Sequence, residues 1–231
     1  MAGVTELSNA SLHFSILKHF VDHGHAPTRA TLVEMFDASP AAVVEALRLL
    51  ADDHGVVLHP HEPEVWVIHP FSTAPTPFIV RFQERNWWGN CAWCSLGIAA
   101  ILGGHHVTIQ TTLGAEGSPI TIHIDDHRVR EDLLVHFPIP MTRAWDNVIF
   151  TCSTMLVFGD EPSIDLWSAQ HALPRGDAQP IQKIYAFARV WYGRHLDLTW
   201  RKWSAAEAHD IFQQFGLSGP IWDLPQTKDR F

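Results

Sequence analysis

The chain is poor in cysteine, in charge and in long apolar runs, and each shortage excludes a class of protein. Its three cysteines, Cys91, Cys94 and Cys152, are too few and odd in number for a disulfide scaffold. The most apolar run, residues 92–102, is far shorter than the roughly 20 residues of a membrane-spanning helix. The N-terminus lacks the basic and apolar segments of a signal peptide. We therefore expect a cytoplasmic protein with reduced thiols and no membrane partner.

Positive charge is also scarce. Lys and Arg number 16 against 25 Asp and Glu, which gives a formal net charge of -9. Nucleic-acid binding depends on clustered Lys and Arg, and so does docking on anionic membranes. The hydrophobic share of 46% is typical of a folded globular protein. The composition thus favours a folded protein whose partners do not include nucleic acid.

The first 72 residues show the pattern of three helices followed by two short strands. Helical spacing of apolar residues covers 11–23, 28–36 and 40–54, and strands are expected at 56–58 and 65–68. This order is typical of a winged helix-turn-helix module. Its third helix would contact DNA, but Glu45, Asp52 and Asp53 would be repelled by phosphates. We therefore expect a structural or substrate-covering module rather than a DNA reader.

A proline-rich stretch at 73–77 predicts a linker between residues 1–72 and 78–231. Beyond it, strands follow strands rather than alternating with helices. The expected strands are 78–80, a hairpin of 107–113 with 120–124, and a buried run at 147–158, and the expected helices are 91–102, 163–171, 181–195 and 205–215. The fold class is therefore α+β: a winged-helix-like three-helix module, then a mixed or antiparallel sheet with flanking helices.

The cysteines are the main candidates for chemistry. Cys91 and Cys94 stand at the start of the helix expected over 91–102, with Asn90 as its predicted cap. A helix N-terminus lowers the pKa of a thiol, and the thiolate form attacks electrophiles and binds soft metals. Taken alone, the Cys-Ala-Trp-Cys motif leaves three readings open: half a zinc site, a redox pair, or packed small residues. Cys152 falls within the expected strand 147–158.

The order and spacing of these motifs resemble one enzyme family, the alkylmercury lyases. The resemblance rests on the run from Asn90 to Gly97 (NCAWCSLG), the apolar helix closed by Gly103, the hairpin at Gly117, and Cys152 followed by Pro162, Trp167 and His171. It extends over roughly residues 10–200, and the last 30 or so residues lie outside it.

The resemblance implies an enzyme that cleaves a carbon–mercury bond by protonolysis. By position, Cys94 and Cys152 match the two cysteines that capture mercury, and Cys94 would be the more nucleophilic. The expected substrate is a small organometallic or electrophilic compound, Hg(II) is the bound product, and no cofactor is required. Cellular thiols and a mercuric reductase are the implied partners in detoxification.

The chain departs from that family where the proton donor is expected. The resemblance implies an aspartate at the position of Gly97, which has no side chain. In one account a cysteine thiol delivers the proton directly, either Cys91 or the second capturing cysteine Cys152, and Cys91 can also serve as a third thiol ligand. In a second, the protein binds mercury or Cu(I) through thiolates without catalysis. In a third, it is a diverged enzyme for another electrophilic or soft-metal substrate.

Overall fold

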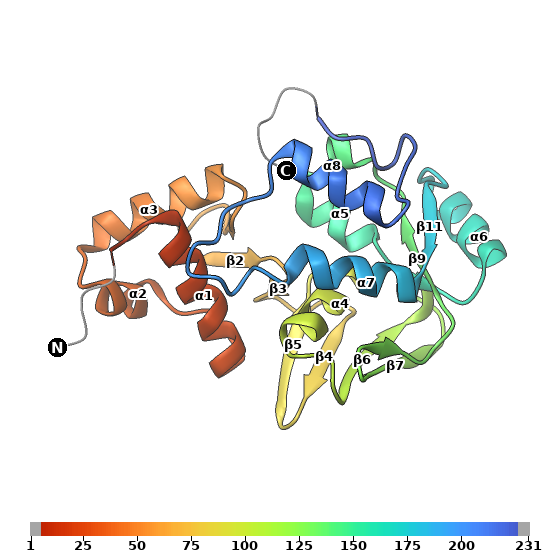
Figure 1. The fold of residues 1–231 in the computed structure, drawn as a ribbon, viewed down its shortest axis with the longest axis horizontal. Helices are drawn as coiled ribbons and strands as arrows, with labels where there is room; N and C mark the ends of the chain where they lie inside the picture. The colour runs from red at the N-terminus through yellow and green to blue at the C-terminus, as the bar shows by residue number, and fades with distance from the viewer. Residues whose placement is uncertain (1–5, 226–231) are drawn as a thin grey trace.

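The N-terminal part consists of three helices that gather at one end of the molecule (Figure 1). The structure is a computed structural model and describes residues 6–225. The helices are α1 (Asn9–His23), α2 (Arg29–Phe36) and α3 (Pro40–Asp52). Thr28 and Ser39 cap α2 and α3 through their side chains, and Pro40 is the first residue of α3, as the sequence predicted.

A large antiparallel sheet begins in this N-terminal part and continues beyond it. Its strands are β1 (Val57–Leu58), β2 (Val65–Ile68), β3 (Phe71–Ser72), β4 (Ile79–Phe82), β5 (Arg85–Gly89), β6 (Val107–Thr112), β7 (Pro119–Asp125) and β8 (Arg128–Val129). Their order across the sheet is β1-β2-β3-β5-β4-β6-β7-β8. Since β3 pairs with both β2 and β5, the sheet connects the two predicted domains. The domain boundary at 73–77 and the winged-helix identification stay predictions.

The expected hairpin at 107–124 is confirmed as β6 and β7, with Val107 opposite Ile124. A second, smaller antiparallel sheet has the order β10-β9-β11. Its strands are β9 (Leu134–Phe137), β10 (Val157–Phe158) and β11 (Asp177–Pro180). The remaining helices are α4 (Ala92–Ile101), α5 (Val148–Thr154), α6 (Glu161–His171), α7 (Ile181–Tyr192) and α8 (Ala205–Gln214). The α+β fold class is therefore confirmed.

Helix α4 lies at the centre of the fold and packs against α7 (Figure 1). Every residue from Ala92 to Ala99 is buried, because the large sheet covers one side of α4 and α7 another. A helix that is apolar all round is stable only when it is enclosed in this way. Its N-terminus, which carries two of the cysteines, is thus held rigidly inside the protein.

Two local predictions are wrong. Residues 148–154 form helix α5, not part of a strand, so Cys152 lies on a helix. The run is rich in β-branched residues, but the Asn147 side chain accepts a hydrogen bond from Phe150 N at 3.0 Å and starts a helix there. A short apolar run does not distinguish a strand from a buried helix. At α4 the cap is Cys91 rather than Asn90, because the Cys91 sulfur accepts a hydrogen bond from Cys94 N.

Across residues 6–225, the structure contains no helix long and apolar enough to cross a membrane.

Candidate functional site

Three segments far apart in the sequence meet at the N-terminus of α4. The loop after β2 reaches it through a hydrogen bond from Asn90 N to Pro70 O at 3.2 Å. The end of α5 reaches it through a hydrogen bond from Ala92 N to Met155 O at 3.0 Å. These two backbone contacts flank the first cysteine of the motif on either side. They bring His69, Cys94 and Cys152 together, and the ligand atoms of the three side chains all lie within 4.8 Å of one another.

Cys94 is the thiol that the site favours as a thiolate. Burial alone would raise its pKa, but hydrogen bonds from the Cys152 and Cys91 thiols and from the Tyr192 hydroxyl lower the pKa of Cys94 well below its ordinary value. The Tyr192 oxygen lies 3.5 Å from Cys94 Sγ. The position of Cys94 in the first turn of α4 also favours a negative charge on its sulfur. The site therefore holds a nucleophilic sulfur inside the protein.

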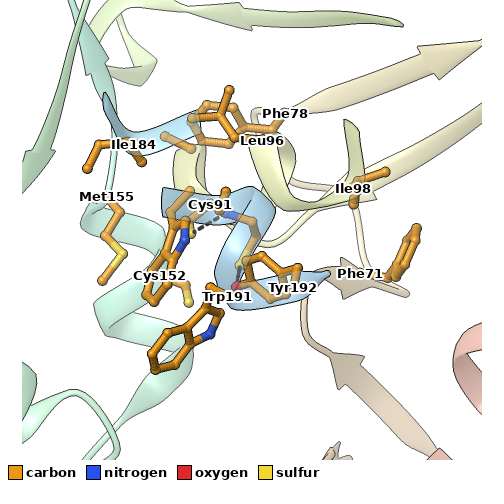
Figure 2. Close-up of a cluster of buried hydrophobic side chains, with 14 of the residues drawn as sticks. Phe71, Phe78, Cys91, Leu96, Ile98, Cys152, Met155, Ile184, Trp191 and Tyr192 are labelled. Atoms are coloured by element: carbon orange, nitrogen blue, oxygen red, sulfur yellow. Dashed lines mark hydrogen bonds between the residues drawn. The ribbon is translucent and has the colours of Figure 1, made fainter. Parts of the chain in front are cut away.

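The other two thiols keep their protons. Burial, reinforced by its thiol neighbours, raises the pKa of Cys91 well above the ordinary value. A hydrogen bond with Cys91 would lower the pKa of Cys152, but the charge on Cys94 and burial raise that pKa well above the ordinary value. These directions make Cys94 the thiol of the cluster that ionises most readily. Figure 2 shows Cys91, Cys152 and Tyr192 within the same buried cluster.

A cavity of about 50 Å³ opens onto two of the three cysteines. Its lining combines sulfur, aromatic and basic side chains: His69, Trp93, Cys94, Met141, Ala144, Trp145, Val148, Thr151, Cys152, Met155, Trp191, Tyr192, His195 and Lys202. Cys91 is fully buried and is not among these residues. The arrangement therefore presents Cys94 and Cys152 to a small molecule and keeps Cys91 behind them.

Tyr192 occupies the space that a side chain at position 97 would need. A Cβ atom added to Gly97 would lie 2.3 Å from Tyr192 Cδ2, which is far inside van der Waals contact. Helix α7 carries this ring against α4, and its hydroxyl faces Cys94. Burial first, and then the charge on Cys94, raise the pKa of Tyr192 well above its ordinary value. Position 97 thus lies directly beside the thiolate, but its side-chain volume is filled from α7.

Two basic groups of the cavity were missed by the sequence reasoning. Lys202 Nζ lies 4.4 Å from the centre of the Trp145 ring, and burial lowers the pKa of Lys202 to about 7. Burial lowers the pKa of His195 to about 3, so this imidazole is neutral. Both lie beyond α7, in a segment without a recognisable motif. No sequence signal distinguished them from the other basic residues of the chain.

His69 was also missed. Its Nε2 atom lies 3.7 Å from Cys152 Sγ and 3.3 Å from the side-chain nitrogen of Asn90. Burial lowers the pKa of His69, so the imidazole is neutral at ordinary pH. With 16 histidines in the chain, a single one before a proline gave no signal. Only the folded arrangement shows that it faces the cysteines.

The comparisons with known proteins agree with this geometry. The family model described as MerB, alkylmercury lyase, matches residues 71–193, a range that includes Cys91, Cys94 and Cys152. Among solved structures, the mercury-bound form of MerB2 matches with a TM-score of 0.62 and 17% identity. The match covers 79% of this chain and 91% of that one, and at this identity it shows a shared fold. No curated protein matches the chain.

Proposed function

Because this chain belongs to the alkylmercury lyase family, we propose that it cleaves a carbon–mercury bond by protonolysis, with Cys94 and Cys152 holding the mercury. The observation that carries the proposal is the pair of thiols that face one small cavity, one of them with a lowered pKa. Mercury is a soft metal and binds thiolate sulfur in preference to nitrogen or oxygen. A site that buries such a pair next to apolar walls suits a small organomercurial cation.

The reaction balances as follows. The Cys94 thiolate binds the mercury of R–Hg⁺, and Cys152 releases its proton to water as it becomes the second sulfur ligand. The carbon–mercury bond then breaks, its electron pair stays on carbon, and a proton completes the hydrocarbon R–H. Hg(II) stays bound to two thiolates as a neutral unit, which a buried site tolerates better than a charged one. Small cellular thiols would then remove the Hg(II).

Lys202 supports the protonation step in place of an acid at position 97. Its ammonium lines the same cavity as the two cysteines, and its pKa of about 7 is suited to proton donation near neutral pH. Donation converts the ammonium to the neutral amine, which regains a proton from water. We thus assign Lys202 as the general acid of this chain. Tyr192 keeps its own proton too strongly for this role and instead stabilises the Cys94 thiolate.

Cys91 has a supporting part in this proposal. Its sulfur accepts a hydrogen bond from Cys94 N at 3.2 Å, and it does not line the cavity. Direct protonation of a substrate carbon by Cys91 is therefore disfavoured relative to Lys202. Its thiol hydrogen bond to Cys94 stabilises the thiolate before the substrate arrives.

The main alternative is a thiolate protein that captures Hg(II) or Cu(I) without turnover. The absence of a carboxylic acid at position 97 favours this capture protein. The same absence favours a diverged enzyme with another electrophilic substrate. A cytoplasmic role in mercury detoxification, with handover to a mercuric reductase, belongs to the lyase proposal alone.

Incubation of the reduced protein with methylmercury or phenylmercury and excess small thiol separates these functions. A lyase releases methane or benzene over many turnovers and loses that activity in Cys94→Ser and in Cys152→Ser. Cys91→Ser is the matched control and should retain turnover at a reduced rate. Tight binding of the organomercurial without hydrocarbon release would sink the lyase proposal and favour the capture protein.

A further inference from the structure

His69 is the strongest feature of the site that the lyase reaction does not use. It comes from the loop between β2 and β3, whereas Cys94 comes from α4 and Cys152 from α5. One nitrogen of its ring and the two sulfurs all lie within 4.8 Å of one another. The β2–β3 loop, α4 and α5 thus each contribute one potential ligand atom to the same place, and all three residues line the cavity.

The imidazole is prepared to act as a ligand. Its Nε2 atom lies 3.7 Å from Cys152 Sγ and accepts a hydrogen bond from the Asn90 side-chain amide at 3.3 Å, which a bound cation would replace. Nδ1 is buried and has no hydrogen-bond partner among residues 6–225. The edge of the ring meets the Trp145 ring, with 5.5 Å between the ring centres. A neutral, immobilised imidazole is the form in which histidine binds metals.

The donor set selects the charge and the class of the cation. Two thiolates and a neutral imidazole carry two negative charges, so a divalent cation gives a neutral complex, whereas Cu(I) leaves one negative charge in a buried site. Thiolate and imidazole donors suit zinc and its softer relatives cadmium and mercury. Two cysteines and one histidine with an open fourth position form a known type of zinc coordination.

We infer that His69, Cys94 and Cys152 form a three-ligand site for one borderline or soft divalent cation of the zinc group, with its fourth position open to the cavity. The site does not require carbon–mercury cleavage, and a cation bound in it occupies both capturing sulfurs. Divalent ions of this group are therefore expected to compete with organomercurials. After cleavage, His69 would also be a third ligand for the product Hg(II).

Cadmium alone is the probe of choice for this site. Titration of the reduced, full-length protein should give one bound Cd(II) per chain, with the ultraviolet charge-transfer absorption of cadmium thiolates. His69→Gln, which keeps the size of the side chain, should weaken binding by roughly tenfold or more. His136→Gln removes a buried imidazole of β9 that does not line the cavity and should change affinity less than twofold. His69→Cys supplies a different soft ligand and should restore tight binding.

A spectroscopic measurement distinguishes ligation from a structural effect. In protein with ¹⁵N-labelled histidine, Cd(II) should shift the ring nitrogens of one imidazole, and that signal should be missing in His69→Gln. Unchanged affinity in His69→Gln, an unshifted His69 ring, or no cadmium binding by the wild-type protein would each overturn the inference. Methylmercury turnover, measured in parallel, reports on the lyase proposal separately, since a failed cadmium site leaves the two-cysteine capture intact.

Discussion

At the scale of single residues, Gly97 and Tyr192 act as one unit. A methyl group at position 97 would collide with the Tyr192 ring, which α7 holds against α4. We expect Gly97→Ala to lower the free energy of unfolding by about 1–3 kcal/mol, the usual cost of overpacking a core. Gly159→Ala is the matched control, because a Cβ there meets nothing within 4 Å. Urea denaturation of the two variants measures the difference, and equal stability would contradict the assignment.

The same pair predicts how an acid can be introduced into the site. Gly97→Asp alone should be destabilised by the Tyr192 ring and gain little turnover. In the double variant Gly97→Asp with Tyr192→Ala, the space is free, and the stability loss should be smaller than the sum of the single losses. A double-mutant cycle on unfolding free energy, with hydrocarbon release assayed in parallel, tests the coupling. Strict additivity would show that the two positions do not compete for one volume.

Lys202 makes the reaction depend on pH in a defined direction. Only the protonated amine donates, and its pKa in the fold is about 7, below the ordinary value. The rate of hydrocarbon release should therefore be level below pH 7 and fall about tenfold per unit above it. Single-turnover release with pre-bound methylmercury isolates this step from thiolate capture, which improves as pH rises.

Removal of the amine provides the control for that profile. Lys202→Met should lower the release rate by roughly 10²–10⁴ and abolish its fall above pH 7, with methylmercury binding retained. Lys18→Met changes an exposed lysine on α1 and should leave rate and profile unchanged. A profile that persists in Lys202→Met would transfer the donor role to another group of the cavity.

At the scale of elements, the fold was predictable where local signals agree with burial. The caps Thr28 and Ser39 and the regular alternation of β6 and β7 each depend on neighbouring residues, and these elements were correctly predicted. Strand β3 has two residues and is defined by its partners on both sides, so no sequence pattern could reveal it.

Helix α5 shows why the run around Cys152 was misread. Its apolar, β-branched sequence favours a strand. Two local side-chain hydrogen bonds favour a helix instead: Asn147 caps the first turn, and the Thr151 hydroxyl donates to Ala144 O at 3.0 Å. In the candidate site, the cysteines were predictable from their motif and order. His69 and Lys202 were not, because only the tertiary fold brings them to the cavity.

The cap of α5 should therefore matter for function as well as for stability. Asn147→Ala removes the acceptor for Phe150 N and should cost about 1 kcal/mol of unfolding free energy. Because α5 has only 7 residues, fraying of its first turn should also displace Cys152 and slow methylmercury capture. Ser39→Ala removes the equivalent cap of α3 and should cost similar stability without slowing capture. Stopped-flow capture rates and urea midpoints check both, and equal capture rates in the two variants would refute the link.

At the scale of the whole molecule, the N-terminal helices support the segment that carries Lys202. His13 of α1 stacks on Trp200, with ring centres 3.5 Å apart and planes inclined by 4°. The same imidazole meets His195 edge-on, with 5.5 Å between centres. Trp200 also lies against Gly55, which follows helix α3. The segment around Trp200 is therefore packed against the N-terminal helices. Helices α1, α2 and α3 thus support the cavity indirectly, because none of their residues lines it.

This anchoring predicts a long-range effect of His13. His13→Ala should cost roughly 2 kcal/mol of stability and loosen residues 195–203, since the Trp200 ring loses its stacking partner. Lys202 would then be poorly held over the cavity, so hydrocarbon release should slow while Cys94 and Cys152 still capture methylmercury. His19→Ala, on the same helix but with its ring tilted against that of His23 instead, is the matched control and should leave release unchanged. Limited proteolysis should cut the His13 variant first within 195–203. An intact segment together with normal hydrocarbon release would show that α1 does not position Lys202.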